Sequence, residues 1–113
     1  MKRIIAIIKP NMLDDVIFSL HQVKDFPGAT MTDVRGMGRG FHQHLKENQL
    51  SPSFGYPAYV RIEIVCLDDQ VDEILTNIEE NAWTGKPGDG KIFISPVDEA
   101  IRISTGQRGD DAI

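Results

Sequence analysis

An alternating run of apolar residues at positions 58–67 constrains the fold more than any other feature of this sequence. Side chains of a β-strand point alternately to its two faces, so a period of two marks a strand with one buried face. Charged Arg61 and Glu63 lie on the face opposite the apolar set, which comprises Val60, Ile62, Ile64 and Cys66. The run therefore predicts a long strand packed against a core on one side.

Three further strands are predicted around this one. Residues 2–8, which are apolar from Ile4 onward, predict a strand that ends at Lys9-Pro10, because proline cannot donate to a strand ladder. Residues 30–35 alternate and are β-branched, and a fourth strand begins at Lys91. The alternation of Ile101 and Ile103 is compatible with an extension of the sheet over residues 97–104.

Two amphipathic helices are predicted between the strands, because apolar residues recur there at helical spacing. Asp68 or Asp69 is placed to cap the second helix. The first helix carries Leu13, Val16, Ile17, Leu20 and Val23, and the second carries Val71, Ile74, Leu75, Ile78 and Ala82.

The resulting order, β-α-β-β-α-β, predicts an α+β fold of the ferredoxin-like type, with two helices on one face of an antiparallel sheet. The opposite face also carries apolar residues, including Ile5, Ile7, Val65 and Phe93. A small domain with two apolar sheet faces needs a partner on the uncovered side. We therefore expect a homo-oligomer.

Length and composition exclude several classes of protein. The 113 residues, with 41% hydrophobic and 26% charged residues, suit a single globular domain over residues 1–113. A net charge of −5 without a basic stripe argues against nucleic acid as a partner. Apolar runs are too short for membrane insertion or a signal peptide. The lone Cys66 offers neither a disulfide framework nor a cysteine metal cluster, so we expect a cytoplasmic protein.

Residues 84–95, T-G-K-P-G-D-G-K-I-F-I-S, form a glycine-rich stretch with chemical potential. Successive backbone amides in such a loop can bind an anion, and Lys86 and Lys91 add positive charge. A phosphate-binding loop and a simple helix-to-strand turn with glycine caps both fit. A P-loop NTPase is disfavoured, because Ile92 stands where a magnesium-binding Ser or Thr is needed and a strand follows instead of a helix.

Four segments together resemble the P-II signal-transduction family: I-I-K-P at 7–10, T-D-V-R-G-M-G-R at 32–39, V-R-I-E-I-V at 60–65 and T-G-K-P-G-D-G-K-I-F-I-S-P-V at 84–97. The resemblance implies a ferredoxin-like homotrimer that binds ATP, ADP or AMP in clefts between subunits. It implies a non-enzymatic regulator with a long mobile T-loop, about residues 38–57, that contacts a membrane transporter or metabolic enzyme. The nucleotide-binding loop is then residues 84–91, and residues 98–113 form a C-terminal segment.

The resemblance also implies which residues bind the nucleotide. One side of the cleft is formed by Ile7, Gly36, Gly38 and Arg39. The other side, from the neighbouring subunit, is formed by Thr30, Gly88, Asp89, Gly90 and Lys91, together with Arg102. Val65 is assigned to the nucleotide site as well.

Several positions depart from the family pattern. Ser104 replaces a second arginine, Gly40 replaces a glutamine that helps bind magnesium and 2-oxoglutarate, and Tyr59 replaces a lysine. Pro52 stands where some members carry a modified tyrosine. The preference among ATP, ADP and AMP, the binding of magnesium and 2-oxoglutarate, and the partner's pathway (nitrogen, inorganic carbon or metal transport) are left open.

Two histidines support an alternative function. His42 and His44 alternate within the loop, so in an extended segment their imidazoles share a side and could bind Zn or Cu. This alternative is a metal-binding trimer of the copper-tolerance type, or a metal-responsive regulator. The other interpretation is a solvent-exposed polar loop. An enzyme is the least supported class: Asp89 and Glu63 are available as acid–base groups, but no nucleophile–base pattern is present.

Overall fold

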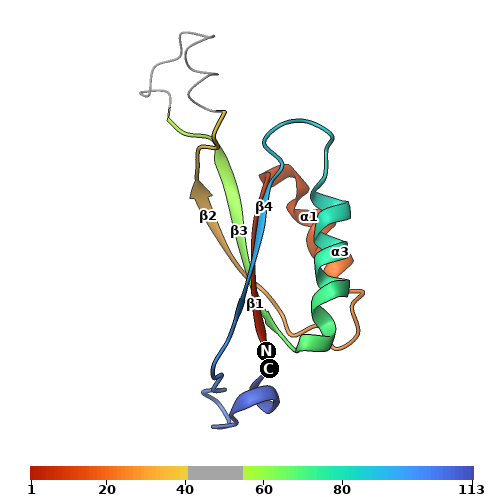
Figure 1. The fold of residues 1–113 in the computed structure, drawn as a ribbon, viewed down its shortest axis with the longest axis vertical. Coiled ribbons are helices and arrows are strands. Elements are labelled where there is room, and N and C mark those ends of the chain that lie inside the picture. Colours follow the sequence, from red (N-terminus) through yellow and green to blue (C-terminus); the bar gives the residue numbers. More distant parts are fainter. Residues whose placement is uncertain (41–54) are drawn as a thin grey trace.

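The computed structural model describes residues 1–40 and 55–113. Within these residues, short 3-10 turns accompany the main elements at Pro10–Met12, Asp68–Gln70 and Gly109–Ala112. The chain order confirms the predicted β-α-β-β-α-β arrangement (Figure 1). The main elements are β1 (Lys2–Ile8), α1 (Leu13–Leu20), β2 (Thr30–Arg35), β3 (Ala58–Cys66), α3 (Val71–Ala82) and β4 (Gly90–Pro96).

The four strands form one antiparallel sheet in the order β2-β3-β1-β4. Both helices lie on the same face of this sheet (Figure 1). The central strand β1 pairs with β3 on one side and β4 on the other, so that Ile4 faces Ile64 and Ile94. The α+β ferredoxin-like fold predicted from the sequence is therefore confirmed.

The core lies between the helices and the sheet face that they cover. Its strand residues follow the predicted alternation, because every second side chain of β1 and β3 is buried. Helix α1 is shorter than predicted: it ends at Leu20, and Val23 is buried in the turn that follows. The core comprises Ile4, Ala6, Ile8, Val16, Leu20, Val23, Val60, Ile62, Ile64, Cys66, Ile74, Ile78 and Ala82.

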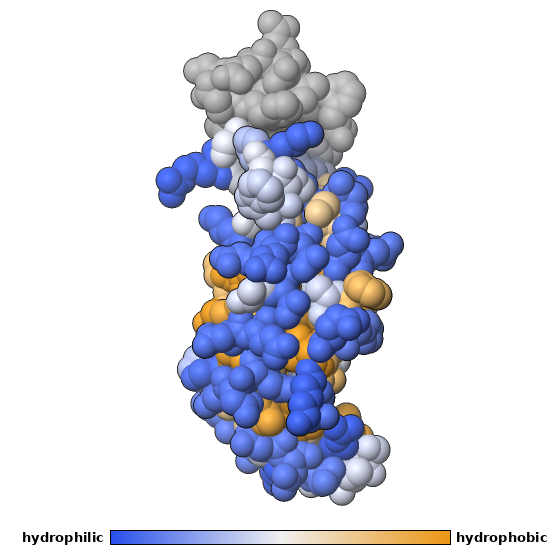
Figure 2. Space-filling view, turned by 90° about the vertical axis from the view of Figure 1, so that its right-hand side faces the viewer, coloured by the Kyte–Doolittle hydropathy of each residue, from blue (hydrophilic) through white to orange (hydrophobic). Residues whose placement is uncertain are grey.

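The opposite sheet face carries no described helix and is partly apolar. Ile5 and Val65 are half-buried there, and Phe93 keeps 55% of its surface exposed. By contrast, the solvent side of the helices is largely hydrophilic (Figure 2). None of the described helices is long and apolar enough to cross a membrane.

The predicted aspartate cap of the second helix is wrong. No side-chain cap forms at Leu67, which precedes the turn Asp68–Gln70, and Gln70 Oε1 instead accepts a hydrogen bond from the Leu67 N–H at 3.1 Å. The Met1 amino group donates a hydrogen bond to the Asp68 carboxylate at 3.0 Å, and this hydrogen bond, together with the charge of the amine, lowers the pKa of Asp68. Asp68, which the sequence predicts as a helix cap, therefore pairs with the N-terminal amine instead.

The predicted extension of the sheet over residues 97–104 is also wrong. The Val97 N–H donates to the Met1 carbonyl at 3.2 Å, and β4 ends at Pro96. The chain turns back instead, with a single bridge between Ile101 and Arg108. Ile103 is 98% exposed, so its alternation with Ile101 does not mark a strand.

Candidate functional site

The glycine-rich stretch forms a loop between α3 and β4, at the end of the sheet where α1 begins (Figure 1). Its last glycine, Gly90, has a φ of 111°, and a Cβ there would lie 1.7 Å from the backbone oxygen of Ile7. Gly88 also has a positive φ of 86°. Only glycine permits this close backbone approach together with this conformation. The loop therefore enters β4 in direct contact with β1.

A polar cluster of Lys9, Thr84 and Asp89 fixes the shape of this loop. The Thr84 N–H donates to Asp89 Oδ2 at 2.7 Å, and the Thr84 hydroxyl donates to Asp89 Oδ1. Lys9 Nζ lies 3.1 Å from Asp89 Oδ1 and 3.3 Å from Thr84 Oγ1. The two hydrogen bonds from Thr84, assisted by the Lys9 charge, lower the pKa of Asp89 to about 2. Asp89 is thus a carboxylate that braces the loop.

Tyr59 of β3 stands between this loop and the start of the 38–57 segment. A Cβ placed on Gly36 would lie 3.7 Å from its ring, and one placed on Gly88 would lie 3.4 Å from its hydroxyl and 3.9 Å from Lys9 Cε. The Gly36 N–H donates to the Pro57 carbonyl at 3.1 Å. The glycine loop and the base of the segment are therefore neighbours in space.

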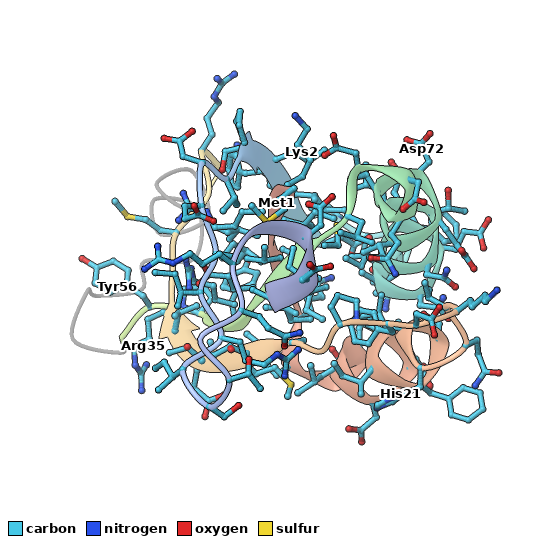
Figure 3. All side chains as sticks on the ribbon, turned by 90° about the horizontal axis from the view of Figure 1, so that it is seen from below. Met1, Lys2, His21, Arg35, Tyr56 and Asp72 are labelled. Atoms are coloured by element: carbon cyan, nitrogen blue, oxygen red, sulfur yellow. The ribbon has the colours of Figure 1, made fainter. Side chains whose placement is uncertain are left out.

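A second hydrogen bond closes the base of the 38–57 segment. The Arg35 guanidinium donates to the Tyr56 carbonyl at 3.1 Å, and Figure 3 shows these two residues together on the side away from the helices. We call Arg35, Gly36, Tyr56 and Pro57 the neck. The neck joins the end of β2 to the start of β3 and bounds residues 38–55.

Comparison with known proteins decides the family. The family model described as "Nitrogen regulatory protein P-II" matches residues 1–107. The chain belongs to the P-II family. It is 46% identical to the nitrogen regulatory protein P-II of Pasteurella multocida, 43% to that of Haemophilus influenzae and 42% to that of Azospirillum brasilense. Each alignment spans 113 residues and the whole of both chains.

The metal-binding alternative receives no support from these matches. His42 and His44 lie outside the described residues. Within residues 1–40 and 55–113, no group of three or more His, Cys, Asp or Glu side chains could hold a metal ion. The buried Cys66 thiol is part of the core, and its burial raises its pKa.

Within one P-II chain, some of the predicted site residues lie side by side and others lie far from them. Lys91 pairs with Ile7 across β1 and β4, so these two residues are neighbours within one chain. In the expected division, they lie on opposite sides of a cleft between subunits, and that division stays a prediction. Strand pairing, which the sequence segments alone do not define, brings the loop to Ile7.

The remaining predicted residues lie elsewhere in the P-II chain. Thr30 is the first residue of β2 and pairs with Glu63, whereas Val65 pairs with Arg3. Arg102 belongs to the C-terminal turn, where its N–H donates to the Gln107 carbonyl at 2.9 Å. Val65 lies toward the opposite end of the sheet, where β4 also ends before Arg102, whereas Thr30 is level with Ile5 in the middle of β1. Gly38 and Arg39 are exposed, beyond the neck.

Sequence reasoning missed Lys9, Thr84 and Tyr59 as parts of this site. Lys9 was interpreted only as the end of a strand, and Tyr59 only as a replaced lysine. The spacing of Thr84 and Asp89 within one glycine-rich loop was an available signal, because short polar side chains often hydrogen-bond to nearby backbone.

Proposed function

We propose that this P-II protein is a non-enzymatic regulator that binds an adenine nucleotide between the subunits of a homotrimer. The loop of residues 84–91 holds the phosphates, and the 38–57 segment carries the signal to a transporter or metabolic enzyme in the cytoplasm. The observation that carries the proposal is the position of the glycine loop. Its Gly88–Gly90 backbone, with Lys91 beside it, lies next to the neck of the partner-binding segment.

The chemistry of the loop supports phosphate recognition. Backbone N–H groups in positive-φ glycine segments form anion-binding concavities, and lysine supplies a point charge for phosphate. Lys86 and Lys91 are exposed. The Asp89 carboxylate is occupied by Thr84 and Lys9, so its negative charge is partly neutralised. The loop is therefore shaped and charged for an anion.

Assembly is supported by the helix-free sheet face. Phe93 on that face is 55% exposed, and its neighbours Ile5 and Val65 are only half-buried, so a second copy could cover apolar surface there. A second copy covering this face would bring its own residues, including Thr30, Val65 and Arg102, toward the glycine loop of its neighbour. The proposed site is therefore completed by assembly.

A regulatory rather than enzymatic role is supported by the carboxylates. Glu63 accepts a hydrogen bond from Arg61 at 3.0 Å and lies 3.9 Å from Arg3. Asp89 is held by Thr84 and Lys9. Both groups are engaged as ion-pair partners, an arrangement that does not suit a general base awaiting a proton.

The ligand class can be tested by isothermal titration calorimetry with ATP, ADP and AMP, each with and without magnesium and 2-oxoglutarate. We expect micromolar binding of at least one nucleotide, with one site per chain, and a trimeric mass by light scattering. The Lys91→Gln variant should bind more weakly, because a cation beside the loop is lost. Absence of binding by all three nucleotides would refute the proposal.

The partner can be identified separately. The full chain and a variant without residues 41–54 would be used for affinity capture at defined nucleotide concentrations. We expect a transporter or enzyme that is retained by the full chain, lost with the deletion and sensitive to the nucleotide. A partner bound equally by both proteins would contradict the role given to the segment.

A further inference from the structure

The single tryptophan of the chain lies exposed at the end of α3. Trp83 directly follows Ala82, the last residue of the helix, and its backbone is already extended, with φ −74° and ψ 128°. The residue is 71% exposed. Its indole ring lies beside Gly85, where even an added methyl group would crowd it. Trp83 therefore presents a large aromatic surface to solvent, and such surfaces are typical of interfaces.

Two carboxylates share this part of the surface with the ring. Glu79 and Glu80 precede Trp83 by four and three positions, a spacing that places side chains next to one another on a helix. The three side chains line a shallow depression of about 340 Å³. An indole ring attracts a cation to its face, and carboxylates bind one by charge and hydrogen bonds. The depression therefore suits a positively charged group.

The negative charge at this end of α3 is not balanced by the helix itself. Two acidic residues of α3 lie in its first turn, where the helix dipole favours acids, but Glu79 and Glu80 lie in its last turn, where the dipole favours cations. Across residues 1–40 and 55–113, none of the ion pairs includes Glu79 or Glu80. The helix contains no lysine or arginine, and its acidic residues are Asp72, Glu73, Glu79 and Glu80. A cation bound from outside would offset this unfavourable placement.

A second depression continues the surface along α3 and favours a chain segment over a small cation as the occupant. Trp83 and Asp72 are 11 positions apart, which is about 17 Å along a helix and the length of about five extended residues. Both depressions are bordered by α3, on the side of the sheet opposite to the face that assembly would cover (Figure 1). The second depression has a volume of about 430 Å³ and is lined by Asp72, Leu75, Thr76, Glu79, Ile92 and Ile94.

We propose that this α3 surface docks an arginine-bearing segment of a partner protein. Arginine fits better than lysine, because its planar guanidinium stacks on an aromatic ring and pairs with a carboxylate through two hydrogen bonds. The charge of the segment complements Glu79 and Glu80, and its length matches the two depressions. This docking needs neither nucleotide nor residues 38–57, so it gives a partner a second contact beyond the proposed function.

Trp83 is also the probe, because the chain has no other tryptophan. A blocked tetra-arginine peptide is titrated into the full-length protein at low ionic strength, without nucleotide, while tryptophan fluorescence is recorded. Tetra-lysine and tetra-glutamate are the matched peptides. Calorimetry repeats the titration with Glu79→Gln/Glu80→Gln and with Trp83→Leu. The control is Asp14→Asn/Asp15→Asn, which makes the same change of charge at two exposed residues of α1.

Tetra-arginine should change the fluorescence saturably, with one site per chain, and tetra-glutamate should not. Tetra-lysine should bind about threefold more weakly, because it lacks the planar stacking group. Glu79→Gln/Glu80→Gln should weaken tetra-arginine binding about tenfold, and Trp83→Leu about fivefold. The Asp14→Asn/Asp15→Asn control should change it less than about twofold, because charges beyond a Debye length are screened. Circular dichroism should be unchanged, because all the substituted side chains are exposed.

Three results would overturn the docking site. Equal weakening by the two double variants would show that the peptide follows net charge alone. Free arginine that binds as tightly as tetra-arginine would make a small cation the occupant. Absence of any fluorescence change at millimolar peptide would leave no binding to explain. Each result leaves the nucleotide proposal intact, and failure of nucleotide binding in calorimetry leaves this docking site intact.

Discussion

Among Gly→Ala substitutions in the candidate site, Gly90→Ala should destabilise the protein most. Gly90 begins β4, where it pairs with Ile8 of β1. An added Cβ would lie 1.7 Å from the Ile7 oxygen and 2.8 Å from the Ile7 carbonyl carbon. Both are backbone atoms of a central strand, so neither can rotate away as a side chain would.

The cost can be worked from these distances. To reach an ordinary contact of about 3.4 Å, the two strands must separate by about 1.7 Å, which exceeds the range of an N–H···O bond. The nearest ladder bonds are then lost at about 0.5–1.5 kcal/mol each. Partial exposure of the buried Ile8 adds about 1 kcal/mol. A positive φ for alanine costs a further 1–3 kcal/mol or so. For two lost ladder bonds, the total is about 3–7 kcal/mol.

A matched control isolates the collision from the backbone strain. Gly28 has nearly the same φ, 105° against 111°, but nothing lies within 4 Å of a Cβ placed there. Gly28→Ala therefore carries the strain of about 1–3 kcal/mol alone. Gly90→Ala should be about 3 kcal/mol less stable than this control, which corresponds to a melting temperature roughly 12 °C lower for a domain of this size.

The assay is urea unfolding followed by circular dichroism, with both variants at the same protomer concentration because assembly shifts apparent stability. Nucleotide binding should be lost in Gly90→Ala and retained in Gly28→Ala. Free energies of unfolding within about 1 kcal/mol of one another would refute the account of Gly90.

Three further predictions concern the groups around the same loop. The pKa of Asp89 is lowered to about 2, from its ordinary value of 3.8, so its carboxylate stabilises the fold above about pH 4 and this contribution is lost as the pH falls toward 2. Urea unfolding from pH 6 to 2.5 should therefore show a steeper acid loss in wild type than in Asp89→Asn, and equal slopes would contradict the brace. Lys91→Gln should weaken ADP binding about tenfold by calorimetry while Lys86→Gln, farther from β1, has a smaller effect; the reverse order would contradict the placement of the phosphates. Tyr59→Lys should raise the ratio of ATP to AMP affinity about tenfold by adding a cation beside Gly88, and an unchanged ratio in competition titrations would show that this position does not face the phosphates.

The strands are predictable from the sequence because burial of one sheet face requires an alternating pattern of apolar residues. One face of β1 and β3 is buried, so every second residue must be apolar, and the structure keeps that register from Ile4 to Ile64. The start of β4 was misplaced by only one residue, at Lys91 instead of Gly90. Local patterns define such elements well, since burial acts on neighbouring residues in sequence.

The errors share a different physical origin. Asp68 was assigned to a helix cap, but the Met1 amine, 67 positions away, binds it. The extension over residues 97–104 fails because the chain turns back after Val97, whose N–H donates to the distant Met1 carbonyl. In both cases the deciding group lies far away in sequence and only close in space.

The site shows the same division between local and long-range information. A loop over residues 84–91 is predictable from the sequence, because the conformational freedom of its glycines is a local property. The polar cluster of Lys9, Thr84 and Asp89 is not predictable, because Lys9 and Thr84 are 75 positions apart and no pattern in the sequence links them. The position of Tyr59 between Gly36 and Gly88 likewise depends on three separate elements.

The ion pair between Lys9 and Asp89 affects which nucleotide we expect this chain to prefer. Because Lys9 pairs with Asp89, its charge is largely cancelled within the loop, and Lys86 and Lys91 remain as the cations that the loop itself can offer. Tyr59 adds a hydrogen-bond donor at Gly88 without adding charge. A loop with two available cations matches the charge of a monophosphate or diphosphate better than that of a triphosphate. Any stronger attraction to ATP would have to come from cations outside the loop, for which Arg39 and a neighbouring subunit's Arg102 are the candidates, whereas Ser104 contributes no charge. If the proposed nucleotide binding holds, we therefore expect ADP and AMP to compete effectively with ATP in calorimetric displacement titrations.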